Sequence, residues 1–251
     1  MGNFWVIVNK VINDSDILLL VLDSRFVNET RNWEIEKKVK DLGKPLIYVM
    51  TKCDLVDQSE AEKSKKELSP SVFVSSKEHL GTTMLRDRIL IEAKRAGIKK
   101  SVKVGVLGYP NVGKSSLINA VRGREVAPTS ILSGCTRGVQ KIKADNRIIF
   151  LDTPGVIPFR EKDSMKHCFI GTTDFTRSRE PDLVVMGLME RFPGRIESFY
   201  GVKLREDKEK TIEDIAKKKN ILKKGSVLDV MRAATMILKD WQKGVINIRS
   251  E

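Results

Sequence analysis

The segment at residues 108–115, which reads G-Y-P-N-V-G-K-S, constrains the fold of this chain more than any other segment. Glycines at this spacing expose successive backbone N–H groups, and a helix that starts after them points its N-terminus at the same place, so the pattern favours an anion-binding loop. Residues 101–107 have the pattern of a buried strand, and residues 116–121 that of a helix. The succession of strand, loop and helix predicts a phosphate-binding unit in an α/β domain.

The last residues of this loop carry the chemistry of a nucleoside triphosphate site. We expect Lys114 to reach the β- and γ-phosphates and Ser115 to offer its hydroxyl to Mg²⁺. A plain glycine turn without a ligand is the alternative, and the flanking strand and helix argue against it.

A second phosphate-facing segment follows the apolar run Ile148–Leu151, where residues 152–155 read D-T-P-G. An acidic residue at the carboxyl end of a strand suits a magnesium-associated carboxylate, so we assign this role to Asp152. The N–H group of Gly155 is expected to bind a γ-phosphate. Alone, D-T-P-G is more typical of an ordinary turn, but its pairing with the phosphate loop favours the nucleotide site.

The polar stretch between these segments contains S-G-C-T-R at residues 133–137. A threonine in such a stretch can add its hydroxyl to Mg²⁺ when a γ-phosphate is present, as in an order–disorder switch. We expect Thr136 to have this role, with Thr129 as the alternative.

Base selection is expected from the N-terminal half. The apolar run 46–50 predicts a buried strand, and residues 51–54, T-K-C-D, follow at its carboxyl end. Asp54 can accept two hydrogen bonds from guanine, which adenine cannot supply, while the stem of Lys52 can cover the base. The next short strand, Val72–Val74, leads into S-S-K at residues 75–77, where a backbone N–H suits the guanine carbonyl.

The order of these motifs, with the guanine reader before the phosphate loop, resembles the circularly permuted GTPases of the YlqF/YawG (RbgA-like) family, and D-S-R at 23–25 is similar to the family's D-A-R element. The resemblance implies a P-loop GTPase three-layer sandwich with a mostly parallel sheet, permuted, plus a small C-terminal all-α domain. It also implies a GTPase that acts on the large ribosomal subunit or its precursor and binds rRNA in a GTP-dependent way.

The expected nucleotide contacts come from the motifs above and are Thr51, Lys52, Asp54, Ser75, Ser76, Lys77, Asn111, Val112, Gly113, Lys114, Ser115, Ser116, Asp152 and Gly155. Lys114, Thr136 and Gly155 are the expected catalytic residues, and Ser115, Thr136 and Asp152 are the expected Mg²⁺ residues. Asn111 matches a position that coordinates K⁺ in related GTPases, and the alternative is a loop-shaping asparagine.

Hydrolysis is expected to be slow without a partner. Many regulatory GTPases have a water-orienting glutamine after the D-x-x-G glycine, whereas this chain has Val156. An aliphatic side chain cannot orient the attacking water.

We expect a GTPase domain at residues 1–187 and a basic, helical, RNA-binding domain at residues 188–251. In the second domain, residues 211–214 have the pattern of a helix start. An apolar stripe at helical spacing follows and contains Val227, Val230, Met231, Ala234, Leu238 and Trp241. Basic residues lie off this stripe and include Lys208, Lys210, Lys217, Lys218, Lys219, Lys223, Lys224 and Arg232.

The composition agrees with a cytoplasmic protein that meets polyanions. The formal net charge is +13 and the pI is about 9.6, which favours RNA over a merely solvated basic surface. The three cysteines have no metal-binding spacing, and the longest apolar runs are too short to span a membrane, so disulfides, zinc sites and membrane spans are not expected. A GTP-dependent regulator of a protein or of an anionic membrane surface is the alternative function.

Overall fold

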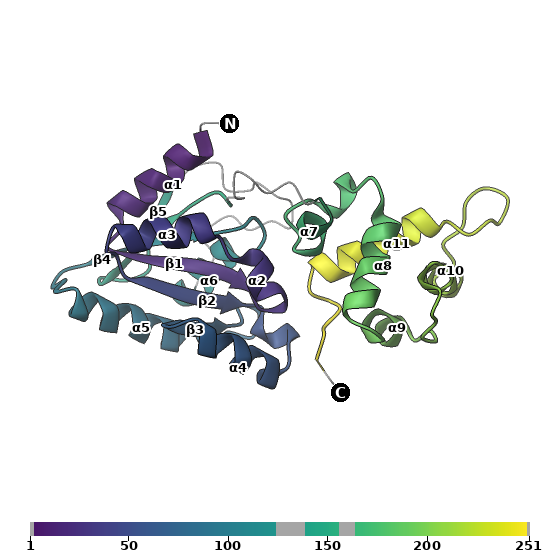
Figure 1. Ribbon diagram of the computed structural model, residues 1–251, viewed down its shortest axis with the longest axis horizontal. Helices are drawn as coiled ribbons and strands as arrows, with labels where there is room; N and C mark the ends of the chain where they lie inside the picture. The colour runs from purple at the N-terminus through teal and green to yellow at the C-terminus, as the bar shows by residue number, and fades with distance from the viewer. Residues whose placement is uncertain (1–2, 124–138, 156–163, 250–251) are drawn as a thin grey trace. The chain divides into compact units, whose positions relative to one another are not determined.

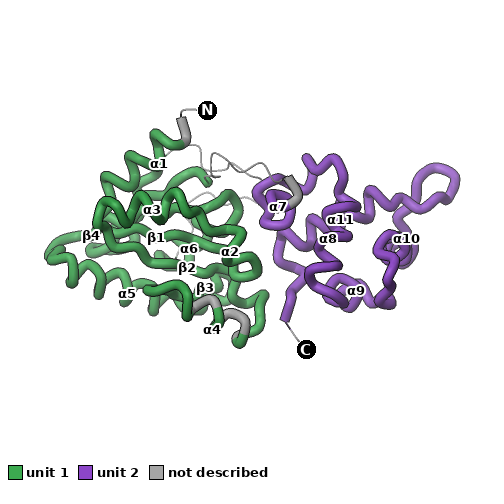
Figure 2. Tube along the Cα trace, viewed as in Figure 1, with its two compact units in different colours: residues 1–162 green, residues 163–251 purple. Residues whose placement is uncertain are grey.

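A computed structural model of the chain describes residues 3–123, 139–155 and 164–249 (Figure 1). These residues fall into two compact units, residues 1–162 and residues 163–251 (Figure 2). Each unit has its own buried core and is described here by itself.

The first unit is built on a six-stranded sheet in the order β3-β2-β1-β4-β6-β5. All neighbouring pairs in this sheet are parallel except the edge pair β5 and β6, which is antiparallel. The strands are β1 (Ile17–Asp23), β2 (Leu46–Thr51), β3 (Ser71–Val74), β4 (Val102–Gly108), β5 (Gln140–Lys143) and β6 (Ile148–Asp152).

Helices cover both faces of the sheet, which gives the three layers expected from the sequence (Figure 1). The α-helices of this unit are α1 (Asn3–Asp14), α2 (Val27–Thr30), α3 (Trp33–Asp41), α4 (Gln58–Glu67), α5 (Thr82–Arg95) and α6 (Lys114–Arg122), and the 3₁₀ helices are η1 (Ser24–Phe26) and η2 (Cys53–Leu55). Helices α1 and α3 pack on one face, while α5 and α6 contact each other and pack on the other.

Strand β1 shows why both faces are covered. Every residue of its sequence I-L-L-L-V-L-D is buried, because a strand between two helical layers has no solvent-facing side. Leu18, Leu20 and Leu22 join one core cluster with Val8 and Val11 of α1. The continuous apolar run is therefore the sequence signature of the central, doubly covered strand.

The second unit is helical. Its helices are α7 (Ser164–Phe169), η3 (Phe175–Arg177), α8 (Pro181–Arg191), α9 (Arg195–Tyr200), α10 (Lys208–Lys218) and α11 (Val230–Gln242). Side chains at the end of α11 bond to the end of α7 and to the segment that follows α7. The indole Nε1 of Trp241 donates to the carbonyl of Phe169 at 3.0 Å, and Nε2 of Gln242 donates to the carbonyls of Cys168 and Thr173 at 3.3 and 3.0 Å.

The boundary between the units lies between residues 162 and 163, earlier than the predicted boundary between residues 187 and 188. The reason is the packing of α8, which contacts α7, α10 and α11 of the second unit. Its apolar residues Val184, Val185, Leu188 and Met189 are buried. The residues that follow β6 therefore enter the helical unit sooner than the sequence pattern indicated.

The helical stripe predicted for α11 is correct at its C-terminal end and wrong at its start. Val227 is 60% exposed, because α11 begins only at Val230 and Val227 lies in the segment before it. Met231, in the first turn of α11, is 41% exposed. The buried face instead includes Ala233 and Ile237. Helix α10 also starts earlier than predicted, at Lys208, where Asp207 caps it by accepting the N–H of Lys210 at 3.2 Å.

No helix in the described part of the chain is both long enough and apolar enough to cross a membrane.

We predict that Trp241→Ala destabilises the second unit by roughly 3–5 kcal/mol, because it empties a fully buried site and leaves the carbonyl of Phe169 without its indole donor. Denaturant unfolding followed by hydrogen exchange of α8 and α11 measures this loss. The matched control is Trp33→Ala, since Trp33 is 62% exposed and its replacement should cost about 1 kcal/mol or less. Equal losses for the two variants would contradict the packing described for α11.

Candidate functional site

Parallel pairing brings the carboxyl ends of β1, β2, β4 and β6 to one edge of the sheet. The motifs singled out in the sequence follow these ends directly: residues 51–54 follow β2, residues 108–115 follow β4, and residues 152–155 close β6. The strands that follow β1 and β4 in the sheet lie on opposite sides of this pair, because β2 is next to β1 and β6 is next to β4. The pair β1 and β4 is therefore the topological switch point of the sheet. This is the place where open α/β sheets bind ligands.

The phosphate loop joins β4 to α6 with an unusual backbone path. Gly113 and the non-glycine residue Asn111 have positive φ angles of 95° and 60°. Asparagine tolerates this left-handed conformation better than most residues. Gly108 passes so close to β1 that a Cβ atom there would lie 2.5 Å from the carbonyl oxygen of Val21. The conformation of the loop is therefore set by residues that tolerate positive φ angles and by the close approach of Gly108 to the backbone of β1.

Lys114 lies across this loop. Its Nζ donates to the carbonyl oxygens of Gly108 at 3.2 Å and Tyr109 at 2.6 Å. Burial lowers the pKa of Lys114 to about 8, and the nearby carboxylate of Asp152 opposes that shift. An ammonium that is buried among loop carbonyls is suited to bind phosphate oxygens, which would offset the cost of its burial.

A hydroxyl and a carboxylate meet next to the loop. Oγ of Ser115 donates to Oδ2 of Asp152 at 2.8 Å, which links the start of α6 to the end of β6. Oxygen donors of this kind are the ones that Mg²⁺ takes together with substrate phosphates. Gly155 packs against the loop so tightly that a Cβ atom there would lie 2.3 Å from Cα of Pro110. The residues assigned to Mg²⁺ and to the γ-phosphate are thus brought together, except Thr136, which lies outside the described residues.

Thr51 connects the guanine-reading segment to the phosphate loop. Its Oγ1 lies 2.9 Å from the carbonyl oxygen of Leu22 in β1 and 2.5 Å from that of Val112 in the loop. Because Thr51 is buried, these contacts fix the spacing between the base-reading and phosphate-binding segments. Asp54 lies in the short helix η2, which follows β2 directly. The turn of this helix is closed by the N–H of Leu55, which donates to the carbonyl of Lys52 at 3.0 Å.

A buried carboxylate holds Lys52. Asp23, at the end of β1, has no exposed surface and accepts Nζ of Lys52 at 2.7 Å. It also accepts Nε and Nη2 of Arg25 at 3.0 and 2.9 Å. Burial alone would raise the pKa of Asp23, but Arg25 and Lys52 together outweigh it and hold the pKa well below its usual range. The carboxylate is therefore charged, and it holds the ammonium of Lys52 at the end of β1.

The sequence pattern contains the D-S-R element at residues 23–25 but predicts no role for Asp23 and Arg25 in the site. Asp23 is absent from the nucleotide contacts that the sequence predicts, and its carboxylate faces Lys52 and Arg25, so that it acts through them. An acidic residue that ends a fully apolar strand was the available signal. The partners of Asp23 depend on the parallel register of β1 and β2, in which Asp23 lies opposite Thr51.

The loop after β3 is closed on itself. Ser75 and Leu80 exchange backbone hydrogen bonds at 3.1 and 3.0 Å, and Oγ of Ser75 accepts the N–H of Glu78 at 3.0 Å. Ser76 and Lys77 are thus presented on a fixed turn beside the end of β2. The segments that the sequence assigned to the nucleotide therefore follow the carboxyl ends of β2, β3, β4 and β6, which lie at one edge of the sheet.

The chain matches known proteins in both sequence and fold. The family described as 50S ribosome-binding GTPase matches residues 103–230. An uncharacterised GTP-binding protein of Methanocaldococcus jannaschii is 41% identical over 246 residues, which are 96% of this chain and 65% of that protein. Nucleolar GTP-binding protein 2 of Saccharomyces cerevisiae is 32% identical over 251 residues, which are 96% of this chain and 52% of the yeast protein.

The crystal structure of GNP-bound YlqF from T. maritima has the same fold, with a TM-score of 0.64 and 22% identity over 94% of this chain and 92% of that one. The chain spans about half to two thirds of the length of these archaeal and yeast relatives.

We predict that Asp23→Asn lowers the free energy of unfolding at neutral pH by roughly 3–5 kcal/mol, because it leaves the buried Arg25 and the partly buried Lys52 without their carboxylate. The folded-state pKa of Asp23 is depressed, so its contribution is present above the unfolded-state pKa of about 4 and is lost as the pH falls below it. The difference between the wild type and the variant should therefore shrink in acid. Denaturant titrations at several pH values measure it.

The matched control is Asp54→Asn, which removes the base-reading carboxylate and leaves the Asp23 network in place. It should lower guanine-nucleotide affinity by at least about tenfold with little loss of stability. A pH-independent difference for Asp23→Asn would contradict the charged state of Asp23.

Proposed function

We propose, from the premise that this chain belongs to the 50S ribosome-binding GTPase family, that it hydrolyses GTP and acts as a nucleotide-switched assembly factor for the large ribosomal subunit. The observation that carries the nucleotide part is the shared edge at which Thr51 joins the guanine-reading segment to the phosphate loop. The likeness in sequence to nucleolar GTP-binding protein 2 and the family's description support the ribosomal part. Such a factor works inside the cell, and we place it in the cytoplasm.

Each residue of the site has a role in this proposal. Asp54 accepts hydrogen bonds from the guanine ring N–H and amine, and the backbone N–H of Ser76 donates to the guanine carbonyl. The stem of Lys52 covers the base, while its ammonium is held by Asp23. Thr51 sets the distance from base to phosphates, and Ser75 and Lys77 shape the loop that carries Ser76.

On the phosphate side, the backbone of residues 111–116 surrounds the phosphates and Lys114 neutralises their charge. Ser115 and Asp152 would hold Mg²⁺, which would supply positive charge to the phosphates. Gly155 would give its N–H to the γ-phosphate, and Thr136 would add its hydroxyl to the metal when the triphosphate is bound.

Intrinsic turnover is slow in this proposal, since Val156 stands where related GTPases have a glutamine. Asn111 then has one of two roles: its left-handed backbone alone accounts for an asparagine at this place, and its amide oxygen would also suit K⁺.

The second unit supplies the RNA-binding surface in this proposal. Lys217, Lys219, Lys224 and Arg232 are exposed, while the apolar side of α10 and α11 is buried. Such a surface would give a salt-dependent share of the affinity for rRNA. The chain runs from Asp152 of β6 into this unit, so the nucleotide state has a direct covalent route to it.

Lys114→Ala should weaken GTP binding by at least about tenfold and abolish measurable hydrolysis, because the phosphates lose their ammonium partner. Labelled-nucleotide titration and phosphate release measure these effects. Lys103→Ala is the matched control, since Lys103 is an exposed lysine of β4, the strand that leads into the phosphate loop.

Wild-type turnover in K⁺ should exceed that in Na⁺ if Asn111 holds the cation, and equal turnover would leave Asn111 with its loop-shaping role alone.

The full chain should co-sediment with large ribosomal subunits in a GTP analogue more than in GDP, and added salt should weaken the association. Replacing Lys217, Lys224 and Arg232 together by Glu should reduce it by at least about tenfold, because these contacts release counterions. The control carries Glu at the exposed residues Lys37, Lys40 and Lys141 of the first unit. Binding to anionic vesicles or to neither partner, with nucleotide binding intact, would favour the alternative of a regulator without a ribosomal role.

A further inference from the structure

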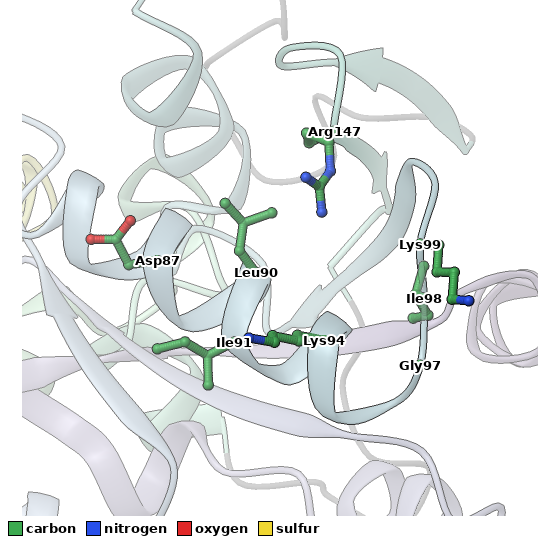
Figure 3. Close-up of a pocket in the computed structure, with 8 residues that line it drawn as sticks. All are labelled: Asp87, Leu90, Ile91, Lys94, Gly97, Ile98, Lys99 and Arg147. Atoms are coloured by element: carbon green, nitrogen blue, oxygen red, sulfur yellow. The ribbon is translucent and has the colours of Figure 1, made fainter.

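The first unit has a hollow of about 830 Å³ that the nucleotide site does not use (Figure 3). It lies between the second half of α5, the segment that follows this helix, and the turn between β5 and β6. Its lining residues are Asp87, Leu90, Ile91, Lys94, Gly97, Ile98, Lys99 and Arg147.

The hollow is at the edge of the sheet opposite to the nucleotide motifs. Residues 97–99 lead into the amino end of β4, and Arg147 directly precedes the amino end of β6. The phosphate loop and Asp152 follow the carboxyl ends of these same two parallel strands. A partner in the hollow would therefore leave the nucleotide site accessible.

The walls of the hollow are fixed by contacts that the fold supplies. Arg86 of α5 forms an ion pair with Asp145 in the turn between β5 and β6. Asp145 also accepts the backbone N–H groups of Arg147 and Ile148 at 2.6 and 2.8 Å, and the carbonyl of Arg147 accepts the N–H of Val102 at 2.7 Å. The turn that carries Arg147 is thus tied to both α5 and the sheet.

The opposite wall is closed in a similar way. After α5 ends, the N–H of Gly97 donates to the carbonyl of Lys94 at 3.1 Å and the N–H of Ile98 donates to that of Ala93 at 2.9 Å. Gly97 has a φ of 73°, which ends the helix and turns the chain toward β4. Ile98 is therefore held beside the last turn of α5.

The lining combines an apolar floor with a cationic rim. Leu90, Ile91 and Ile98 supply the apolar side chains, and Ile91 is 44% exposed. Lys94, Lys99 and Arg147 supply three positive charges against the single carboxylate of Asp87. Within the described part of the chain, none of these three cations forms an ion pair. Figure 3 shows Arg147 extending from its turn toward α5, on the side where Leu90 projects.

We propose that this hollow docks an acidic segment of a protein partner, which inserts an apolar side chain against Leu90, Ile91 and Ile98 and places carboxylates on the surrounding cations. The charge of the rim selects acidic sequences, while burial of the exposed floor needs an apolar residue. RNA fits this lining less well, because no aromatic ring is present to stack on a base and a phosphate gains nothing from an apolar floor.

Methyl NMR of the full chain tests the proposal. The probe is a glutamate-rich peptide of about twelve residues with two leucines four residues apart, a form that presents both leucines on one helical face. Titration should shift the methyl signals of Leu90, Ile91 and Ile98 in a saturable way. The same peptide with serine in place of both leucines should bind at least about tenfold more weakly, because the apolar contact is lost.

The variants Arg147→Glu and Ile91→Asp should each weaken the leucine peptide by roughly tenfold or more, the first through charge and the second through the floor. Lys40→Glu is the matched control, since it makes the same charge change at an exposed site on α3 outside the hollow. GDP affinity should be unchanged in all three variants, which shows that they fold and keeps this test separate from that of GTP hydrolysis.

Three outcomes would overturn the proposal: no methyl shift at millimolar peptide, equal binding of the serine peptide, or no effect of Arg147→Glu. Single-stranded oligouridine that saturates the same methyl signals more tightly than the peptide would assign the hollow to RNA instead.

Discussion

The hydroxyl of Thr51 lies within hydrogen-bonding distance of the carbonyls of Leu22 and Val112, so a single buried side chain touches the end of β1 and the phosphate loop while it belongs to β2. This contact fixes the spacing between residues 51–54 and the phosphate loop, the two segments proposed to read the base and to hold the phosphates. It depends on parallel pairing of β1 with both β2 and β4, which brings three carboxyl ends to one point. The geometry of the candidate site follows from this spatial arrangement of strands and does not depend on the order of the strands along the sequence.

Circular permutation leaves that arrangement intact and changes only where the chain goes next. The strand that ends in Asp152 is the last strand of the sheet along the sequence, and the second unit begins shortly after it. The buried Asp23 network ties the carboxyl end of β1 to Lys52, which follows β2. Both flanks of the nucleotide site are therefore fixed by charged or hydroxyl groups that end a strand.

The two edges of the sheet have different chemistry for a physical reason. At the carboxyl edge the left-handed loop, Lys114 and Asp152 are suited to a ligand with high negative charge. At the amino edge, the short connections 97–99 and 144–147 leave part of α5 exposed, and basic residues surround its apolar side chains. One sheet thus separates the proposed nucleotide site from a surface suited to a protein segment.

The sequence by itself determined the strands that carry the site and the residues at their ends, because the phosphate loop, T-K-C-D and D-T-P-G have spacing that few other structures require. It also indicated the permuted order, which the strand order of the sheet confirms. Only the tertiary structure decided the partners of Asp23, the boundary at residue 162 and the exposed start of the α11 stripe. These features depend on contacts between residues far apart in the chain, such as the packing of α8 on α11, and a local pattern of residue types carries no record of which distant surface will cover it.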